Sequence, residues 1–174
     1  MSYEYFAASL PTLRFGATPP MAVAAFVDAA RTNLAADDFA ALEAALEGRD
    51  GPGFAGAWHA LDAQLRNAVA RARAARRGAD ASKWLRPHAG WSAAAEQGVA
   101  AAFQEADPLK RHLALERLRW DLAGEAAGLD PFSAAAVVAY GVRLAILEGL
   151  ARTDADAGLA RLQSAAQASK PSEP

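Results

Sequence analysis

Residues 134–152 read AAAVVAYGVRLAILEGLAR, and this stretch decides the fold. Large apolar side chains recur along it without leaving a polar face; they are Val137, Val138, Tyr140, Val142, Leu144, Ile146, Leu147 and Leu150. A surface helix keeps one polar face, whereas a helix that is apolar on every side lies inside a protein. The stretch therefore predicts a central helix around which other helices pack.

The composition of the rest of the chain also favours helices. Alanine dominates, and Val, Ile and Thr together number only twelve. Alanine is the best helix former, and β-branched residues favour strands. We expect an all-α protein, a compact irregular bundle of about seven or eight helices. The periodicity and the turn residues predict helices at about 19–33, 37–47, 54–77, 92–105, 108–127, 131–152 and 153–168, with a short helical piece within 79–90 and no clear prediction for 1–17.

Several helix ends carry recognisable signals. Thr18 before Pro19 predicts a cap and a first turn, because proline is tolerated where a helix needs no N–H donor. Asp107 before Pro108 repeats that pattern. Gly78 is suited to end the long helix before it, since glycine readily adopts the left-handed conformation of a helix C-terminus.

The length of 174 residues and the lack of a long linker predict one helical domain over 1–168, followed by a disordered tail at 169–174. The first ten residues lack the basic start and the long apolar run of a secretory signal. The apolar region 134–142 is interrupted by Arg143, which leaves it short of the roughly 18 apolar residues of a membrane span. We therefore expect neither a signal peptide nor a membrane span.

The charges and the absence of cysteine narrow the function classes. The chain has 18 basic and 20 acidic residues, a net charge of −2, whereas general nucleic-acid binders are usually clearly basic. With no cysteine, disulfides, thiolate nucleophiles and cysteine metal sites are excluded.

Catalytic motifs are not found in the sequence. Residues 51–56 match G-x-G-x-x-G, but they follow a predicted helix instead of the strand that dinucleotide binding needs, so we interpret them as a turn. His59 with Asp62 and His112 with Glu116 lie one helical turn apart, and each pair could hold a metal ion only with further ligands. We expect no enzyme activity, no cofactor and no metal, with a helical metal-binding protein as an alternative.

A basic segment, LRNAVARARAARR at 65–77 and its continuation to residue 86, holds the candidate binding site. The candidate partner-binding residues are Arg66, Arg71, Arg73, Arg76, Arg77, Lys83, Trp84 and Arg86, and the segment contains one acid, Asp80. Such a run is often only a solvated helix face. A surface of one sign also attracts an oppositely charged partner, so both interpretations stay open. Nucleic-acid binding through this segment is an alternative, although single-strand sites usually stack several aromatic side chains.

Four segments together resemble a known family. They are YEYFAASLP at 3–11, LRNAVARARAARRGADASKWLR at 65–86, DPLKRHLALERLRWDLAGEAAGLDPF at 107–132 and VVAYGVRLAILEGLARTDADAGLARL at 137–162. In this order they resemble short bacterial proteins encoded with the V-type ATPase. That family is similar to the central-stalk component designated C in archaeal-type rotary ATPases and d in eukaryotes, which forms a socket between the rotor shaft and the membrane ring.

This resemblance implies an all-helical adaptor, similar to that socket component, which passes torque between the shaft and the ring without chemistry of its own. The implied partners are V-type ATPase subunits. The implied location is the cytoplasm, peripheral to the inner membrane through the complex. The socket component is longer and has three related helical units where this chain shows one, so its partial replacement or a role in assembly is also implied. The family has no catalytic motif to transfer.

Overall fold

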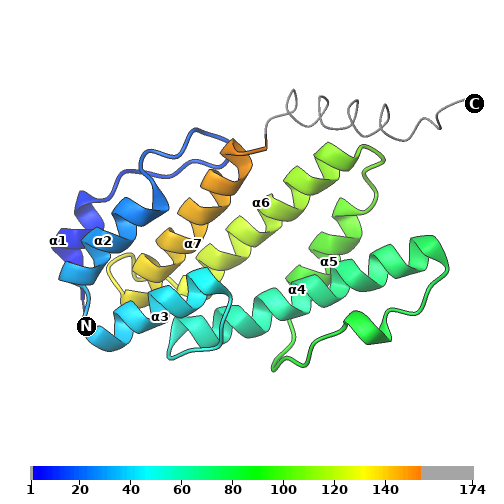
Figure 1. The fold of residues 1–174 in the computed structure, drawn as a ribbon, viewed down its shortest axis with the longest axis horizontal. Helices are drawn as coiled ribbons and strands as arrows, with labels where there is room; N and C mark the ends of the chain where they lie inside the picture. Colours follow the sequence, from blue (N-terminus) through cyan, green and yellow to red (C-terminus); the bar gives the residue numbers. More distant parts are fainter. Residues whose placement is uncertain (1, 154–174) are drawn as a thin grey trace, which may run out of the picture.

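The computed structural model describes residues 2–153, and this part of the chain is helical (Figure 1). Its elements are α1 (Glu4–Ser9), α2 (Val23–Asn33), α3 (Ala36–Glu47), α4 (Phe54–Arg77), the 3-10 turn η1 (Ser82–Trp84), α5 (Ala93–Ala102), α6 (Pro108–Ala127) and α7 (Ala134–Ala151). Within residues 2–153 the only β-type pairing is an isolated bridge between Ser2 and Ser133. The prediction of an all-α, multi-helix bundle is confirmed. The tail at 169–174 and, beyond Thr153, the predicted helix at 153–168 lie outside the described residues.

Helix α7 lies at the centre of the bundle, as its sequence predicts. It packs against α2, α3, α4 and α6, and Figure 1 shows it between α6 and the α2–α3 pair. Its buried residues are Val137, Val138, Ala139, Gly141, Val142, Leu144, Ile146 and Leu147. Because these residues point in every direction around the helix, neighbours are needed on every side.

By length and composition alone, α7 is long and apolar enough for a membrane span, even though Arg143 interrupts its apolar run. A helix buried in the core of a globular protein has the same composition, so this property is weak evidence for a span.

An aromatic cluster brings α1 and α2 onto α7. The Phe26 ring is fully buried, with its centroid 6.2 Å from that of Phe6 and 5.1 Å from that of Tyr140. Gly141 permits this approach, because a Cβ there would lie 2.8 Å from Phe26 Cε1 and 2.7 Å from Leu42 Cδ1. The glycine therefore acts as a contact surface for two neighbouring helices.

Most predicted helix ends are confirmed. Helix α4 covers 54–77, and Gly78 follows it in the left-handed conformation at φ 61°. The Asp107 side chain accepts a hydrogen bond from the Leu109 N–H at 2.8 Å and so caps α6. Ser133 caps α7 by accepting from the Ala136 N–H at 3.1 Å.

The predicted start of α2 at residue 19 is wrong. The helix begins at Val23, and Thr18 caps nothing. Pro20 disfavours helical backbone at the residue before it, so the chain stays extended there. The first N–H of the helix is instead satisfied by the carboxylate of Glu148 on α7, at 3.2 Å from Val23 N. Of the short helical piece predicted within 79–90, only the 3-10 turn η1 forms. Helix α5 ends three residues before the predicted boundary at 105.

Candidate docking surface

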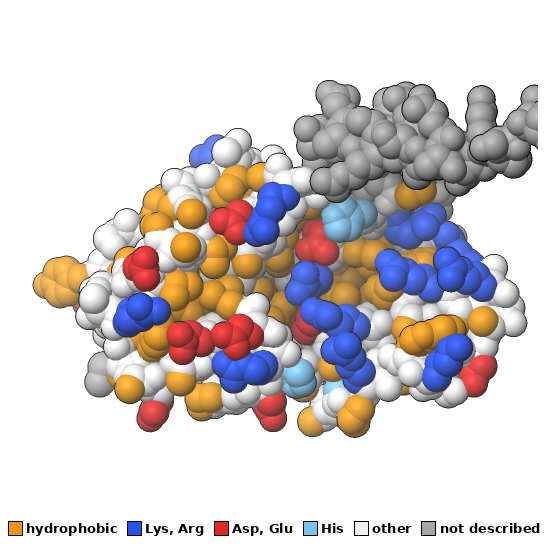
Figure 2. All heavy atoms as spheres, in the orientation of Figure 1, with side chains coloured by type: hydrophobic (Ala, Val, Ile, Leu, Met, Phe, Trp, Pro, Cys, Tyr) orange, Lys and Arg blue, Asp and Glu red, His pale blue; other side chains and the backbone are white. Residues whose placement is uncertain are grey.

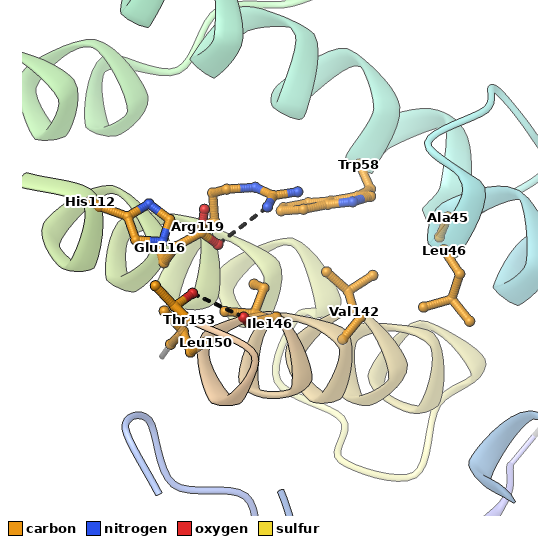
Figure 3. A pocket seen from close by; sticks show the side chains of 12 residues that line it. Ala45, Leu46, Trp58, His112, Glu116, Arg119, Val142, Ile146, Leu150 and Thr153 are labelled. Carbon is orange, nitrogen blue, oxygen red and sulfur yellow. Dashed lines mark hydrogen bonds and ion pairs between the residues drawn. The ribbon is translucent and has the colours of Figure 1, made fainter. Parts of the chain in front are cut away.

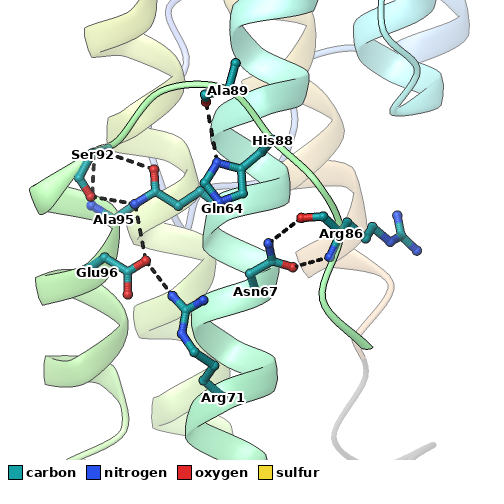
Figure 4. A network of polar contacts seen from close by, with 9 residues as sticks. All are labelled: Gln64, Asn67, Arg71, Arg86, His88, Ala89, Ser92, Ala95 and Glu96. Atoms are coloured by element: carbon teal, nitrogen blue, oxygen red, sulfur yellow. Dashed lines mark hydrogen bonds and ion pairs between the residues drawn. The ribbon is translucent and has the colours of Figure 1, made fainter. Parts of the chain in front are cut away.

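The segment between α4 and α5 runs back along α4 and is fastened to it by two buried amide side chains (Figure 4). Gln64 Nε2 donates to the Ser92 carbonyl at 2.9 Å, and its Oε1 accepts from the Ser92 N–H at 2.8 Å. Asn67 pairs with the backbone of Arg86 in the same way, at 2.7 and 2.9 Å. Each amide therefore imitates a peptide group of a neighbouring strand and holds the segment in place.

The same hydrogen-bond network includes Arg71, one of the predicted partner-binding residues. Gln64 Nε2 also lies 3.2 Å from Glu96 Oε1, and this oxygen accepts from Arg71 Nη2 at 2.6 Å. Arg71 is therefore an internal link between α4 and α5, and its charge is balanced there.

Two further predicted residues serve the packing of α4. Arg66 Nε donates to Asp62 Oδ2 at 2.6 Å, and Asp62 Oδ1 accepts from Arg119 Nε of α6 at 3.1 Å. Arg76 donates to the Phe103 carbonyl, with its Cζ 5.0 Å from the centroid of the Phe103 ring. Arg76 and the Asp62–Arg119 pair connect α4 to neighbouring elements, and these tertiary contacts are not visible in helical spacing.

The remaining four basic residues form the basic surface, defined here as Arg73, Arg77, Lys83 and Arg86. All four are exposed, and within residues 2–153 none has a carboxylate oxygen within 4.0 Å. Figure 2 shows Lys and Arg side chains gathered over the half of the molecule that holds the C-terminal part of α4, whereas the signs are mixed over the other half. The helical spacing correctly predicts that Arg73 and Arg77 share one exposed face of α4.

Two exposed tryptophans lie on the segment that carries Lys83 and Arg86. Trp84 is 51% exposed, and Lys83 Nζ lies 4.4 Å above the centroid of its ring. Trp91, at the end of the same segment, is 72% exposed. Sequence reasoning singled out Trp84 and missed Trp91, although a second tryptophan in one loop was a visible signal. Gln64 and Asn67 were missed too; their signal was a pair of amides among the apolar positions of α4.

Asp80, the single acid of the segment, forms hydrogen bonds within its own turn. The Asp80 carboxylate accepts hydrogen bonds from the Ser82 hydroxyl and from the Ser82 N–H, the latter at 3.0 Å. The hydroxyl and then the N–H hold the pKa of Asp80 below its ordinary value. Asp80 thus shapes the turn before η1.

A cavity of about 310 Å³ between α3, α4, α6 and α7 is the other candidate site (Figure 3). Glu116 Oε2 lies 3.3 Å from Arg119 Nη1, and Figure 3 shows the Arg119 guanidinium alongside the Trp58 indole. His112 lines the same cavity from α6. These polar groups are paired or exposed around an apolar floor, an arrangement that indicates packing between helices.

His59 and Asp62, one of the two suggested metal-binding pairs, are engaged in other contacts. His59 Nδ1 lies 3.0 Å from the Gly48 carbonyl, and the Asp62 carboxylate is shared by two arginines. Among residues 2–153 no three His, Asp or Glu side chains converge as metal ligands. The G-x-G-x-x-G match forms the turn into α4, with Gly53 at φ 55° directly before the helix.

Comparison of the chain with protein-family models, with curated proteins and with solved structures gives no significant match. The class of protein that the fold defines is an all-α helical bundle with an exposed basic surface.

Proposed function

We propose that this protein is a non-enzymatic adaptor that binds an acidic surface of another protein through the basic surface. One observation supports this proposal above the others. Four exposed cations, none with a carboxylate oxygen of the described residues within 4.0 Å, are carried on a helix end and on a segment that is fastened to it. Like charges so placed repel one another, and an acidic partner relieves that repulsion.

The neighbouring tryptophans supply the apolar part of such an interface. Tryptophan and arginine are the residues that most often carry the binding energy of protein–protein contacts. Trp84 and Trp91 both stand exposed on the fastened segment. The charges then set the orientation and the rate of association, and burial of the two indoles supplies affinity. The fitting partner is an acidic surface with small apolar depressions.

We propose a component of a V-type rotary ATPase, in the shaft or the membrane ring, as that partner. The support is the resemblance of four ordered segments to the bacterial proteins encoded with this ATPase. The fold is compatible with the role, because a coupling between moving parts needs packed helices and charged faces. In this proposal the protein is cytoplasmic and is held at the inner membrane through the complex.

Copurification from the native host tests this function. A tagged full-length chain is isolated at low ionic strength after nuclease treatment, and the bound proteins are identified by mass spectrometry. We expect V-type ATPase subunits, released as the salt concentration rises. Recovery of nucleic acid from an untreated sample, with no ATPase component in the treated one, would support the nucleic-acid alternative and refute the adaptor.

A further inference from the structure

Arg143 is an unusual residue for the position that it occupies. It lies on the central helix α7 between the buried residues Val142 and Leu144, and its own side chain is half-buried. Its Nε donates to the Trp120 carbonyl at 2.9 Å, and its Cζ lies 5.1 Å from the centroid of the Trp120 ring. In residues 2–153 no carboxylate oxygen lies within 4.0 Å of its nitrogens.

A glycine on the facing helix makes room for this guanidinium. A Cβ added to Gly124 of α6 would lie 1.8 Å from Arg143 Nη2 and 2.5 Å from its Cζ. Burial lowers the pKa of Arg143, with Arg117 acting in the same direction and Asp121 opposing it. The bundle thus keeps a partly desolvated cation on its central helix.

Arg143 lines a cavity. This cavity, of about 400 Å³, lies between the α1–α2 connection, α6 and α7. Among the described residues every fully buried side-chain nitrogen or oxygen has a hydrogen-bond partner. Since no hydrogen bond of Nη1 or Nη2 of Arg143 is formed there, neither nitrogen is fully buried.

Most side chains on the rest of the cavity wall are apolar. Apolar lining side chains include Leu10, Leu13, Ala136 and Ala139. Two polar groups on its wall form hydrogen bonds with other parts of the chain. The Tyr140 hydroxyl donates to the Pro11 carbonyl at 3.0 Å, and Asp130 Oδ1 accepts from the Phe132 N–H at 2.9 Å. Asp130 stands on the wall and forms no ion pair with Arg143. A guanidinium without a paired carboxylate in the described residues, beside apolar side chains, matches a ligand with one anionic end and an aliphatic body.

We infer that this cavity is a binding site for a carboxylate that carries a short aliphatic group, with the two Nη groups of Arg143 as the carboxylate donors. Arginine binds carboxylates through paired N–H donors, and the apolar walls accept the aliphatic part. A free monocarboxylic acid and the C-terminal leucine of a polypeptide share this chemistry.

NMR spectroscopy of the full chain tests the inference with defined probes. Sodium hexanoate should shift the Arg143 Nε–H and the Trp120 indole signals in a saturable way, and hexanol, which lacks the charge, should not. A short peptide ending in free leucine is compared with its C-terminal amide. A stronger hexanoate response identifies a free acid as the ligand source, and a stronger response to the free peptide identifies a chain end. Both signals unmoved by hexanoate and by the free peptide would refute the site.

Two variants separate binding from folding. Arg143→Met removes the donors, and Gly124→Ala places a methyl group where the guanidinium lies. Each variant should raise the Kd of the hexanoate or peptide probe at least about tenfold, because a charge-assisted hydrogen-bonded pair is lost. Arg31→Met on α2, outside the cavity, should leave affinity unchanged. Wild-type affinity in a folded Arg143→Met protein would overturn the assignment, and the wild-type titration decides the matter if that variant does not fold.

Discussion

Gln64 on α4 and Ser92 at the start of α5 are joined by two hydrogen bonds of 2.8 and 2.9 Å between a side-chain amide and the backbone. This pair joins residues that are 28 positions apart in the chain. It fixes the end of the segment that carries Lys83 and Trp84. The position of the basic surface therefore depends on a buried amide of α4.

Gln64→Ala should lower the free energy of unfolding by about 1–3 kcal/mol, because it leaves the Ser92 N–H without its partner and removes one of the two donors to the Ser92 carbonyl. Urea denaturation followed by circular dichroism measures this loss. Gln97→Ala, at an exposed position of α5, is the matched control and should change stability by less than about 0.5 kcal/mol. Equal stabilities of the two variants would show that the amide pair does not fasten the segment.

Asp62→Asn should be destabilising by about 1–3 kcal/mol, since one buried carboxylate serves both Arg66 and Arg119. Asp121→Asn breaks the exposed pair with Arg117 and should cost less than about 1 kcal/mol. Thermal denaturation at matched ionic strength compares them. A larger effect at Asp121 would contradict the assignment of Asp62 as the link between α4 and α6.

Replacement of two glycines of α7 by alanine should change the stability of the protein in opposite directions. Gly141→Ala places a methyl group against Phe26 and Leu42, and overpacking of this kind costs about 1–3 kcal/mol. At Gly149 a Cβ meets nothing within 4 Å, so Gly149→Ala should stabilise the protein by up to about 1 kcal/mol through helix propensity. Melting temperatures that change in the same direction would argue against the central packing of α7.

Tyr3 should make stability depend on alkaline pH. Burial and then the hydrogen bond from its hydroxyl to Asp38 raise its pKa. A raised folded-state pKa contributes stability below the unfolded value of about 10, and this contribution is lost as the pH rises through the folded pKa. Tyr3→Phe should therefore be less stable than wild type at pH 7, with a gap that narrows above about pH 10. A gap that stays constant to about pH 11 in urea titrations would contradict this linkage.

The sequence predicts helices best where the signals are local. The bounds of α4 and the caps at Asp107 and Ser133 follow from residues that are neighbours in the chain. The start of α2 could not be predicted in this way, because the partner of the Val23 N–H is Glu148, which is 125 residues away. Helix ends that depend on tertiary contacts are not visible in a local pattern.

The basic surface shows the same difference between local signals, which the sequence contains, and tertiary contacts, which it does not reveal. Helical spacing correctly places Arg73 and Arg77 together on an exposed face. It does not distinguish them from Arg71 and Arg76, which are equally basic but bind Glu96 and the Phe103 carbonyl across the α4–α5 contact. Which arginines keep a free charge depends on how α5 packs, and periodicity contains no information about that.

Charge reversal on the basic surface tests the central claim most directly. The double variant Arg73→Glu/Arg77→Glu is compared with Arg14→Glu/Arg31→Glu, which makes the same change in net charge on exposed residues elsewhere. The measurement is the yield of V-type ATPase subunits that copurify with each tagged chain from the native host, after circular dichroism has shown equal helicity. We predict a loss of at least about tenfold for the first variant and none for the second, because only the first opposes an acidic partner. Equal recovery with both variants would contradict the account.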